Sequence, residues 1–205
     1  MKKDLQAAEQ TRPDVRQARH VRITLRQPFM RNLLPRIGFI GETLLKTNTA
    51  KTTGWSPKGG RLIDHAPFGH WKTRTFIAAL RHNRLDAPWV IDGAMNGETF
   101  DLCVETQLAP RLQSGDAIIL DNLSSHKSPT AAAALKAVGA WFLFLPPCSP
   151  DLNPIEMAFS KLKAHLRRIG ARSFTGLFTA LGEICDLYTP QECWNYFCEA
   201  GYAST

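Results

Sequence analysis

Short apolar runs bounded by turn residues recur along the chain and constrain its fold more than any other feature. Residues 37–40, 117–120 and 141–145 have the length and the β-branched or aromatic content of buried strands. Weaker strand patterns cover residues 71–80 and 87–91. Because helical patterns follow the later runs, the sequence predicts a sheet with helices on its faces, in the α/β or α+β class.

The clearest helical pattern covers residues 155–169. Pro154 stands where such a helix begins, and Gly170 stands where it ends. The apolar residues of this helix recur every three or four positions, at Ile155, Phe159, Leu162, Leu166 and Ile169. We expect further helices at residues 98–112, 129–138, 173–187 and 190–199.

The 205 residues suffice for one domain with a short extension. Residues 1–35 are polar and rich in arginine, and Pro13 and Pro28 interrupt them. We expect them to form a basic extension or linker with one short helix after Pro13, followed by a folded domain at residues 36–205.

The net charge of +7 comes mostly from the start of the chain, where residues 1–36 carry nine basic and three acidic side chains. The rest of the chain is nearly neutral, but its charged residues are grouped into blocks of mostly one sign. Residues 46–84 hold eight cations and one acid, residues 86–121 hold seven acids and one cation, and residues 161–172 hold five cations and no acid. Such blocks are compatible with a polyanionic partner.

Five cysteines occur without the paired spacing of a disulfide framework or a zinc site. No apolar run approaches the roughly 18–20 residues that a membrane span needs, and the first fifteen residues are too polar for a signal peptide. We therefore expect no membrane partner and a location in a reducing cytoplasm.

Asp121 directly follows the apolar run 117–120. An acid there lies at the carboxyl edge of a strand, where open sheets bind their ligands. An aspartate that forms a turn or caps a helix is the alternative, so Asp121 alone does not define a site.

Glu156 lies in the first turn of the expected 155–169 helix, where a negative charge also interacts favourably with the helix dipole. The loop before it holds Pro150 and Pro154, which restrict the direction of the carboxylate. On the same helix face lie Ser160, Lys163 and Arg167. A carboxylate followed by cations suits a site that holds a metal ion and then a phosphodiester strand.

The segments ILDNLSSHK (119–127) and FLPPCSPDLNPIE (144–156) resemble the catalytic signature of DDE-type transposases of the mariner-like superfamily, in particular its bacterial insertion-sequence branch. Between Asp121 and Glu156 lie 34 residues, a separation typical of that superfamily. Segments 69–100 and 195–205 are also similar to this branch, so the resemblance runs from about residue 36 to the end of the chain.

This resemblance implies a ribonuclease-H-like α/β fold, a mixed five-stranded sheet flanked by helices. It also implies Mg²⁺-dependent DNA strand cleavage and strand transfer at insertion-sequence ends. Asp121 and Glu156 would be catalytic ligands of a two-metal site that binds Mg²⁺ or Mn²⁺. The implied partners are double-stranded DNA, both the terminal inverted repeats and the target, and a second copy of the chain in a synaptic complex at the bacterial nucleoid.

The chain departs from the family pattern in its first strand, where the family has Asp-Glu-Thr and this sequence has Gly41-Glu42-Thr43. The position of the first acidic ligand therefore holds glycine. Strand side chains alternate between the two faces, so Glu42 is expected to point away from the metal ions unless the register slips by one residue. We expect impaired catalysis, with rescue by Glu42 as the alternative.

Members of the superfamily also carry a longer N-terminal helix-turn-helix region than residues 1–35 can form. The sequence thus predicts a truncated transposase, either the catalytic half of a split reading frame or a decayed remnant. Two rival functions remain open: a noncatalytic DNA-binding or dimerising remnant, and a ribonuclease-H-like nuclease without transposition.

Cations in the basic blocks are candidates for contact with DNA, and a solvated loop face is the alternative for each. His126, five residues after Asp121, is a further candidate, with a plain loop or capping histidine as its alternative. The predicted DNA-binding residues are Lys46, Arg61, Lys72, Arg74, His126, Lys163 and Arg167.

Overall fold

A mixed five-stranded sheet in the order β3-β2-β1-β4-β5 forms the centre of the molecule. β1 (Ile37–Lys46) pairs antiparallel with β2 (Thr73–Arg81), and β2 pairs antiparallel with β3 (Leu85–Asp92). On its other side β1 pairs parallel with β4 (Ala117–Leu120), which pairs parallel with β5 (Trp141–Phe144). The mixed five-stranded sheet predicted from the sequence is confirmed.

The computed structural model describes residues 8–46, 54–63, 65 and 73–204. The first two residues of the strand expected at 71–80 lie outside this part. All other strand predictions are confirmed, although β1 runs six residues further than the apolar run 37–40. β5 was expected to be buried, but it forms one edge of the sheet and Trp141 is half-exposed.

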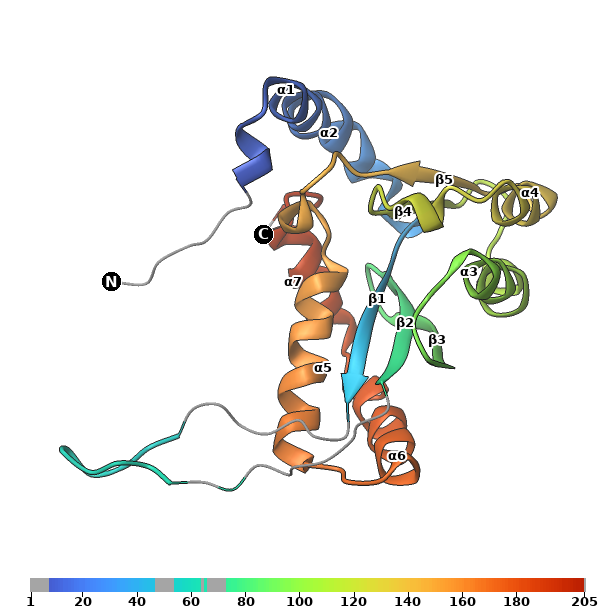
Figure 1. The fold of residues 1–205 in the computed structure, drawn as a ribbon. Helices are drawn as coiled ribbons and strands as arrows, with labels where there is room; N and C mark the ends of the chain where they lie inside the picture. Colours follow the sequence, from blue (N-terminus) through green and yellow to red (C-terminus); the bar gives the residue numbers. More distant parts are fainter. Residues whose placement is uncertain (1–7, 47–53, 64, 66–72, 205) are drawn as a thin grey trace.

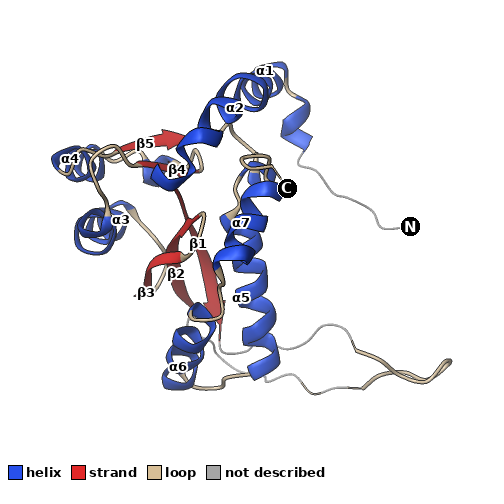
Figure 2. Cartoon of the chain, turned by 180° about the vertical axis from the view of Figure 1, so that it is seen from behind, coloured by secondary structure: helices blue, strands red, loops and turns tan. Residues whose placement is uncertain are grey.

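Helices cover both faces of the sheet (Figures 1 and 2). α5 (Ile155–Ile169), α6 (Phe174–Cys185) and α7 (Pro190–Glu199) lie on one face, and their buried residues form one apolar cluster with the facing side chains of the strands. α3 (Gly97–Cys103) and α4 (Pro129–Ala137) cover the other face and form a second cluster. In the described residues no helix is long and apolar enough to cross a membrane.

α5 begins after Pro154 and ends at Gly170, whose φ of 64° is left-handed and favours glycine. Four of its five predicted apolar residues are buried, but Ile169 is 46% exposed. Ile169 is the last residue of the helix, directly before Gly170. The helical pattern at 98–112 begins as α3 and continues through a π-helical turn at Val104–Leu108.

The N-terminal segment is helical over most of residues 13–36, well beyond the single short helix expected after Pro13. It consists of α1 (Pro13–Val21), a π-helical turn (Arg22–Arg26), α2 (Gln27–Met30) and a 3₁₀ segment (Arg31–Arg36). Pro28 directly follows the π-helical turn, where the ladder of helical hydrogen bonds is already shifted and the Gln27 N–H donates to the Arg22 carbonyl five residues back.

This N-terminal helical segment (residues 13–36) packs against the domain through the buried side chains of Val15, Arg22, Gln27 and Leu34. The amide of Gln27 donates to the Ala200 carbonyl at 3.0 Å. Because two of the four anchoring residues are polar, the segment has no clear apolar period. This explains why the sequence did not predict its full length.

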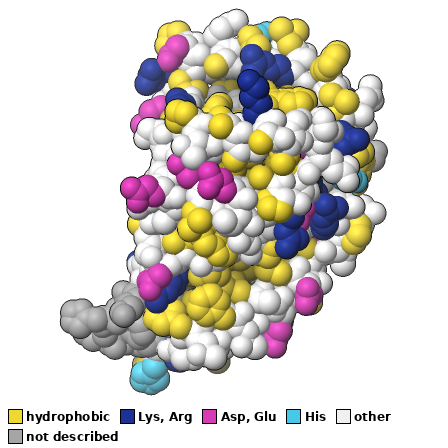
Figure 3. All heavy atoms as spheres, turned by 90° about the vertical axis from the view of Figure 1, so that its right-hand side faces the viewer, with side chains coloured by type: hydrophobic (Ala, Val, Ile, Leu, Met, Phe, Trp, Pro, Cys, Tyr) yellow, Lys and Arg dark blue, Asp and Glu magenta, His cyan; other side chains and the backbone are white. Residues whose placement is uncertain are grey.

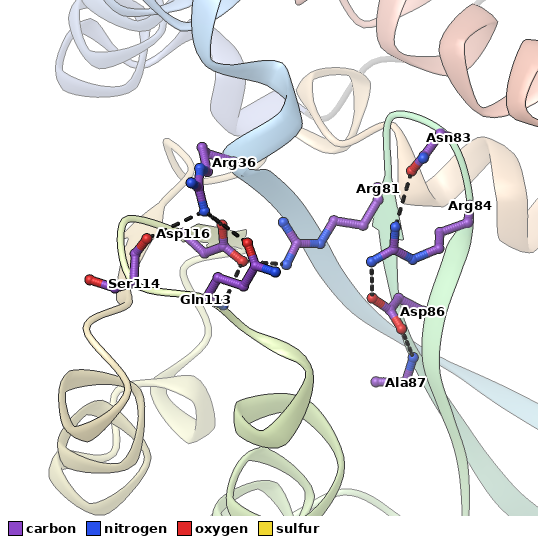
Figure 4. A network of polar contacts seen from close by, with 9 residues as sticks. All are labelled: Arg36, Arg81, Asn83, Arg84, Asp86, Ala87, Gln113, Ser114 and Asp116. Carbon is purple, nitrogen blue, oxygen red and sulfur yellow. Dashed lines mark hydrogen bonds and ion pairs between the residues drawn. The ribbon is translucent and has the colours of Figure 1, made fainter.

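A buried ion pair fixes the start of β4 against β2 (Figure 4). Arg81 Nη2 lies 2.7 Å from Asp116 Oδ2, and the Gln113 N–H donates to the same oxygen at 3.0 Å. Burial raises the pKa of the Asp116 carboxyl, but the hydrogen bonds from Arg81 and Gln113 outweigh it and hold that pKa below its usual value. Since Asp121 directly follows β4, this pair also helps to fix the position of that residue.

Candidate active site at the carboxyl edge of the sheet

Asp121 stands directly after β4, at the carboxyl edge of the parallel part of the sheet. Its carboxylate is half-exposed, and Oδ1 accepts a hydrogen bond from the Leu123 N–H at 3.3 Å. The same oxygen lies 2.6 Å from Nδ1 of His126. One side of the carboxylate is therefore held by the following loop, while the other faces solvent.

Glu156 lies in the first turn of α5, and its N–H donates to the Asn153 carbonyl at 3.1 Å. Although the residue is open to solvent on one side, the neighbouring walls desolvate its carboxylate and raise its pKa. The negative charge of Asp121 raises this pKa further, and the positive charge of Lys163 opposes the shift. Asp121 and Glu156 are thus close enough to repel each other.

The two acids line one cleft of about 330 Å³ between the end of β4 and the start of α5. The loop 145–150 forms another wall, together with Asn122 and Asn153. The structure therefore brings together the two acids that the sequence singled out. Asn153, which sequence reasoning did not single out although it lies in the quoted signature, is buried and its Oδ1 has no hydrogen-bond partner in the described residues.

Gly41 lies beside these acids. Phe39 of β1 is level with Ile119 of β4, and continuing this register by two residues brings Gly41 level with Asp121. A Cβ atom at Gly41 would lie 2.8 Å from Cγ2 of Ile155, so position 41 faces the first turn of α5. A side chain there would point toward the helix that carries Glu156.

Glu42 lies on the opposite face of β1, as the alternation of strand side chains predicts. Its Oε2 is 3.8 Å from Nε2 of His126. The register of β1 does not slip, because Gly41 pairs with Ala78 and Glu42 with Ile77 without interruption. Glu42 therefore does not take the position that Gly41 leaves without a carboxylate.

His126 lies between Glu42 and Asp121. Its ring is 2% exposed and packs on Phe100 with a centroid distance of 4.7 Å. Burial lowers the pKa of the imidazole, but the hydrogen bond to Asp121 and the negative charges of Asp121 and Glu42 outweigh burial and raise it to about 9. The buried imidazolium neutralises acidic charge and does not present its ring to solvent.

The other predicted DNA-binding residues lie in different places. Lys163 and Arg167 lie on α5, beyond Glu156 along the same helix face. Arg74 pairs with Asp92 and lies 4.3 Å from the ring centroid of Phe174, so its charge is already engaged. Of the remaining three, Lys46 and Arg61 are exposed and distant in sequence from the cleft, and Lys72 lies outside the described residues.

The acids of the cleft fit a two-metal site incompletely. Asp121 and Glu156 supply two carboxylates, while Gly41 supplies none. In the described residues no group of three or more His, Cys, Asp or Glu side chains is placed to hold a metal ion. The residues present therefore do not make up the three-carboxylate set implied by the family resemblance.

Residues 36–176 match the family model of the DDE superfamily endonuclease, and the chain belongs to this family. No curated protein matches the chain by sequence.

The fold is similar to that of the Mos1 transposase in a paired-end complex with the left transposon end, with a TM-score of 0.77 and 15% identity over 98% of this chain and 63% of that one. It is also similar to the catalytic domain of the Mos1 mariner transposase, with a TM-score of 0.65 and 14% identity over 97% and 93% of the two chains. The chain thus spans less than two thirds of the Mos1 transposase in the DNA complex but nearly all of its catalytic domain. The predicted ribonuclease-H-like fold of a transposase catalytic domain is confirmed.

Proposed function

We propose that the chain is the catalytic domain of an insertion-sequence transposase that binds transposon-end DNA and whose strand cleavage is impaired at Gly41. The observation that carries this proposal is the position of Gly41, level with Asp121 and facing the first turn of α5. This is where a third carboxylate would join Asp121 and Glu156. The family match and the Mos1-like fold support the class of reaction.

A divalent cation, Mg²⁺ or Mn²⁺, supplies the Lewis acid for phosphodiester cleavage when three carboxylates hold it. Mos1 complexes with Mn and with Mg are among the structures similar to this chain. Here Asp121 is oriented by His126, and Glu156 projects into the same cleft. With only two carboxylates we expect weak binding of the cation and a loss of several orders of magnitude in cleavage rate.

The DNA path of this proposal runs along α5. Lys163 lies about two helical turns beyond Glu156 and Arg167 about three, so a strand that leaves the cleft would pass both cations. By contrast, the side of the molecule that carries α3 and α4 shows hydrophobic side chains between scattered acidic and basic ones (Figure 3). That face lacks the continuous positive charge that a phosphate backbone favours.

Proposed partners are the terminal inverted repeats, the target DNA and a second copy of the chain in a synaptic complex. The structures similar to this chain include the Mos1 strand transfer complex and a pre-cleavage Mos1 transpososome. The missing third carboxylate favours the alternative function, a noncatalytic DNA-binding or dimerising remnant.

Cleavage of end-labelled duplexes that carry the ends of the element encoding this chain, with Mg²⁺ or Mn²⁺, tests the proposal. We expect no cleavage by the natural chain and measurable cleavage by Gly41→Asp. Gly41→Ala is the matched control, because it adds the same Cβ atom without a carboxylate. Cleavage by the natural chain at the rate of Gly41→Asp would contradict the proposal, and failure of Gly41→Asp despite Mn²⁺ binding would favour the noncatalytic alternative.

A further inference from the structure

A second cavity, of about 450 Å³, adjoins the cleft of Asp121 and Glu156. The two cavities share a wall formed by Asn122 and residues 145–147. The opposite wall of the second cavity is the N-terminal helical segment, which lies across the chain that leads from β5 to α5 (Figure 1). That segment contributes Asp14, Gln17, Ala18, Val21, Arg22 and Arg26.

Arg26 brings an uncompensated charge to this cavity. Its side chain is exposed, and within the part of the chain that the structure describes it has no hydrogen bond or ion pair. A free guanidinium carries donors that bind phosphate oxygens well. Its position next to a cavity gives those donors room for a ligand.

Arg22 adds a second positive charge behind the wall. It is 1% exposed, its Nε and Nη2 donate to the Tyr202 hydroxyl at 3.3 and 3.0 Å, and its Nη1 has no partner in the described residues. None of the carboxylates that the structure describes forms an ion pair with this buried cation. Because a buried charge is weakly screened, Arg22 raises the positive potential of the adjoining cavity.

One acid, Asp14, lines the cavity among the described residues, and it is already paired. Its Oδ2 lies 2.7 Å from Nη2 of Arg12, and this partner holds the pKa of the Asp14 carboxyl below its usual value. The acid thus remains ionised and its charge is offset by Arg12. The charges of Arg22 and Arg26 remain to attract an anion.

We propose that this cavity is a phosphate-binding subsite for the DNA strand that enters the cleft of Asp121 and Glu156. Arg26 contacts a backbone phosphate, and Arg22 strengthens the interaction through its charge without touching the strand. The subsite rests on the proposed function, since its ligand is the strand bound in the cleft. It assigns the N-terminal helical segment a part in holding DNA beside the acids.

The test measures how the affinity of the full chain for a fluorescent transposon-end duplex depends on salt. Each phosphate contact contributes about 0.7–0.9 to the slope of log K against log salt concentration. We expect Arg26→Ala to lower the slope by about that amount and Arg26→Lys to preserve it. Arg31→Ala is the matched control, because Arg31 is an exposed arginine of the same segment that does not line the cavity.

A scan with single neutral methylphosphonate linkages locates the contact. We expect one linkage near the cleaved bond to weaken binding of the natural chain while leaving Arg26→Ala unaffected, which is the signature of a shared contact. Equal salt slopes for the natural chain and Arg26→Ala would overturn the subsite and leave the proposed function intact. A slope lowered as much in Arg31→Ala as in Arg26→Ala would do the same. Absence of DNA binding by the natural chain would instead overturn the proposed function. If inorganic phosphate at equal ionic strength removes the difference in DNA affinity between the natural chain and Arg26→Ala, the result would support recognition of a phosphate group.

Discussion

Nδ1 of His126 lies 2.6 Å from Oδ1 of Asp121, while Nε2 of the same ring lies 3.8 Å from Oε2 of Glu42. One buried imidazole thus links the acid that follows β4 to the acid that follows Gly41 on β1. The Glu42 side chain meets this ring on the face of the sheet that α3 and α4 cover, where His126 packs on Phe100. Position 41 faces α5 instead, whose Glu156 lines the cleft together with Asp121. The geometry supports Gly41, and not Glu42, as the position where the third carboxylate is missing.

The stability of the chain is expected to depend on pH through His126. Its pKa is raised to about 9 in the folded chain, against roughly 6.5 when unfolded. The contribution of the imidazolium is therefore fully present below about pH 6.5 and is lost as the pH rises toward about 9, an effect on the order of 1–3 kcal/mol. Urea unfolding of the natural chain and of His126→Gln between these pH values measures it.

We expect the free energy of unfolding of the natural chain to fall over that range and that of His126→Gln to change less. His20→Gln is the control, because His20 is an exposed histidine of α1 and its replacement should leave the pH profile unchanged. Identical pH profiles of stability for the natural chain and His126→Gln would contradict a protonated His126 between Asp121 and Glu42.

The buried pair of Arg81 and Asp116 is expected to be the most sensitive ion pair of the sheet. Both side chains are at most 5% exposed, and Arg81→Met would leave the Asp116 carboxylate without its main partner. Breaking such a pair costs about 3–5 kcal/mol. Chemical denaturation at pH 7 measures the loss, with Arg84→Ala as control because the half-exposed Arg84 pairs with Asp86 at 3.1 Å.

The loss of stability in Arg81→Met is also expected to depend on pH. Because the pKa of Asp116 is held below its usual value, the pair stabilises the folded chain above about pH 4 and loses that contribution as the pH falls through the folded pKa. The difference in unfolding free energy between the natural chain and Arg81→Met should therefore narrow in acid. A difference that stays constant from pH 7 to about pH 3 would assign the loss to packing instead.

Several parts of the site were predictable because their causes are local. The apolar run 117–120 and the start of α5 after Pro154 place Asp121 and Glu156 at element ends, and strand alternation correctly predicts the direction of Glu42. The link from Glu42 to His126 was not predictable, since it joins a strand to a loop far away in the sequence. The N-terminal helical segment was missed for a similar reason, because its anchor Arg22 is polar and binds a tyrosine near the other end of the chain.

The Tyr202 hydroxyl is expected to hold the N-terminal helical segment in place. It accepts hydrogen bonds from Arg22 and donates to the Leu152 carbonyl at 3.0 Å, in the loop that leads to Glu156. Tyr202→Phe leaves the buried guanidinium and that carbonyl unpaired, so we expect a loss of about 2–3 kcal/mol. Chemical denaturation measures this loss, and tryptic digestion should cut residues 13–36 faster in the variant.

Tyr196→Phe is the control for this measurement. Its hydroxyl donates to Glu192 at 2.7 Å at a partly buried position, and Glu192 keeps its ion pair with Lys161 in the variant. We expect a loss below about 1 kcal/mol and no faster digestion. Equal effects of the two substitutions would argue against a special role of Tyr202.

Position 41 lacks a carboxylate, and it is also expected to leave too little room for a side chain. A Cβ atom at Gly41 would lie 2.8 Å from Cγ2 of Ile155 and 3.2 Å from Cε2 of Phe159, both buried side chains. Gly41→Ala should therefore cost about 1–3 kcal/mol, the usual penalty of overpacking a core. Ile155→Leu removes the branch at Cβ with little change in volume, so the double variant Gly41→Ala/Ile155→Leu should recover part of the loss, as chemical denaturation would show.

The extra room that Ile155→Leu makes should also help an aspartate at position 41 to bind Mn²⁺. We expect Mn²⁺ to raise the thermal midpoint of Gly41→Asp/Ile155→Leu more than that of Gly41→Ala/Ile155→Leu. Equal responses of these two double variants to Mn²⁺ would show that a carboxylate at position 41 does not reach the ion.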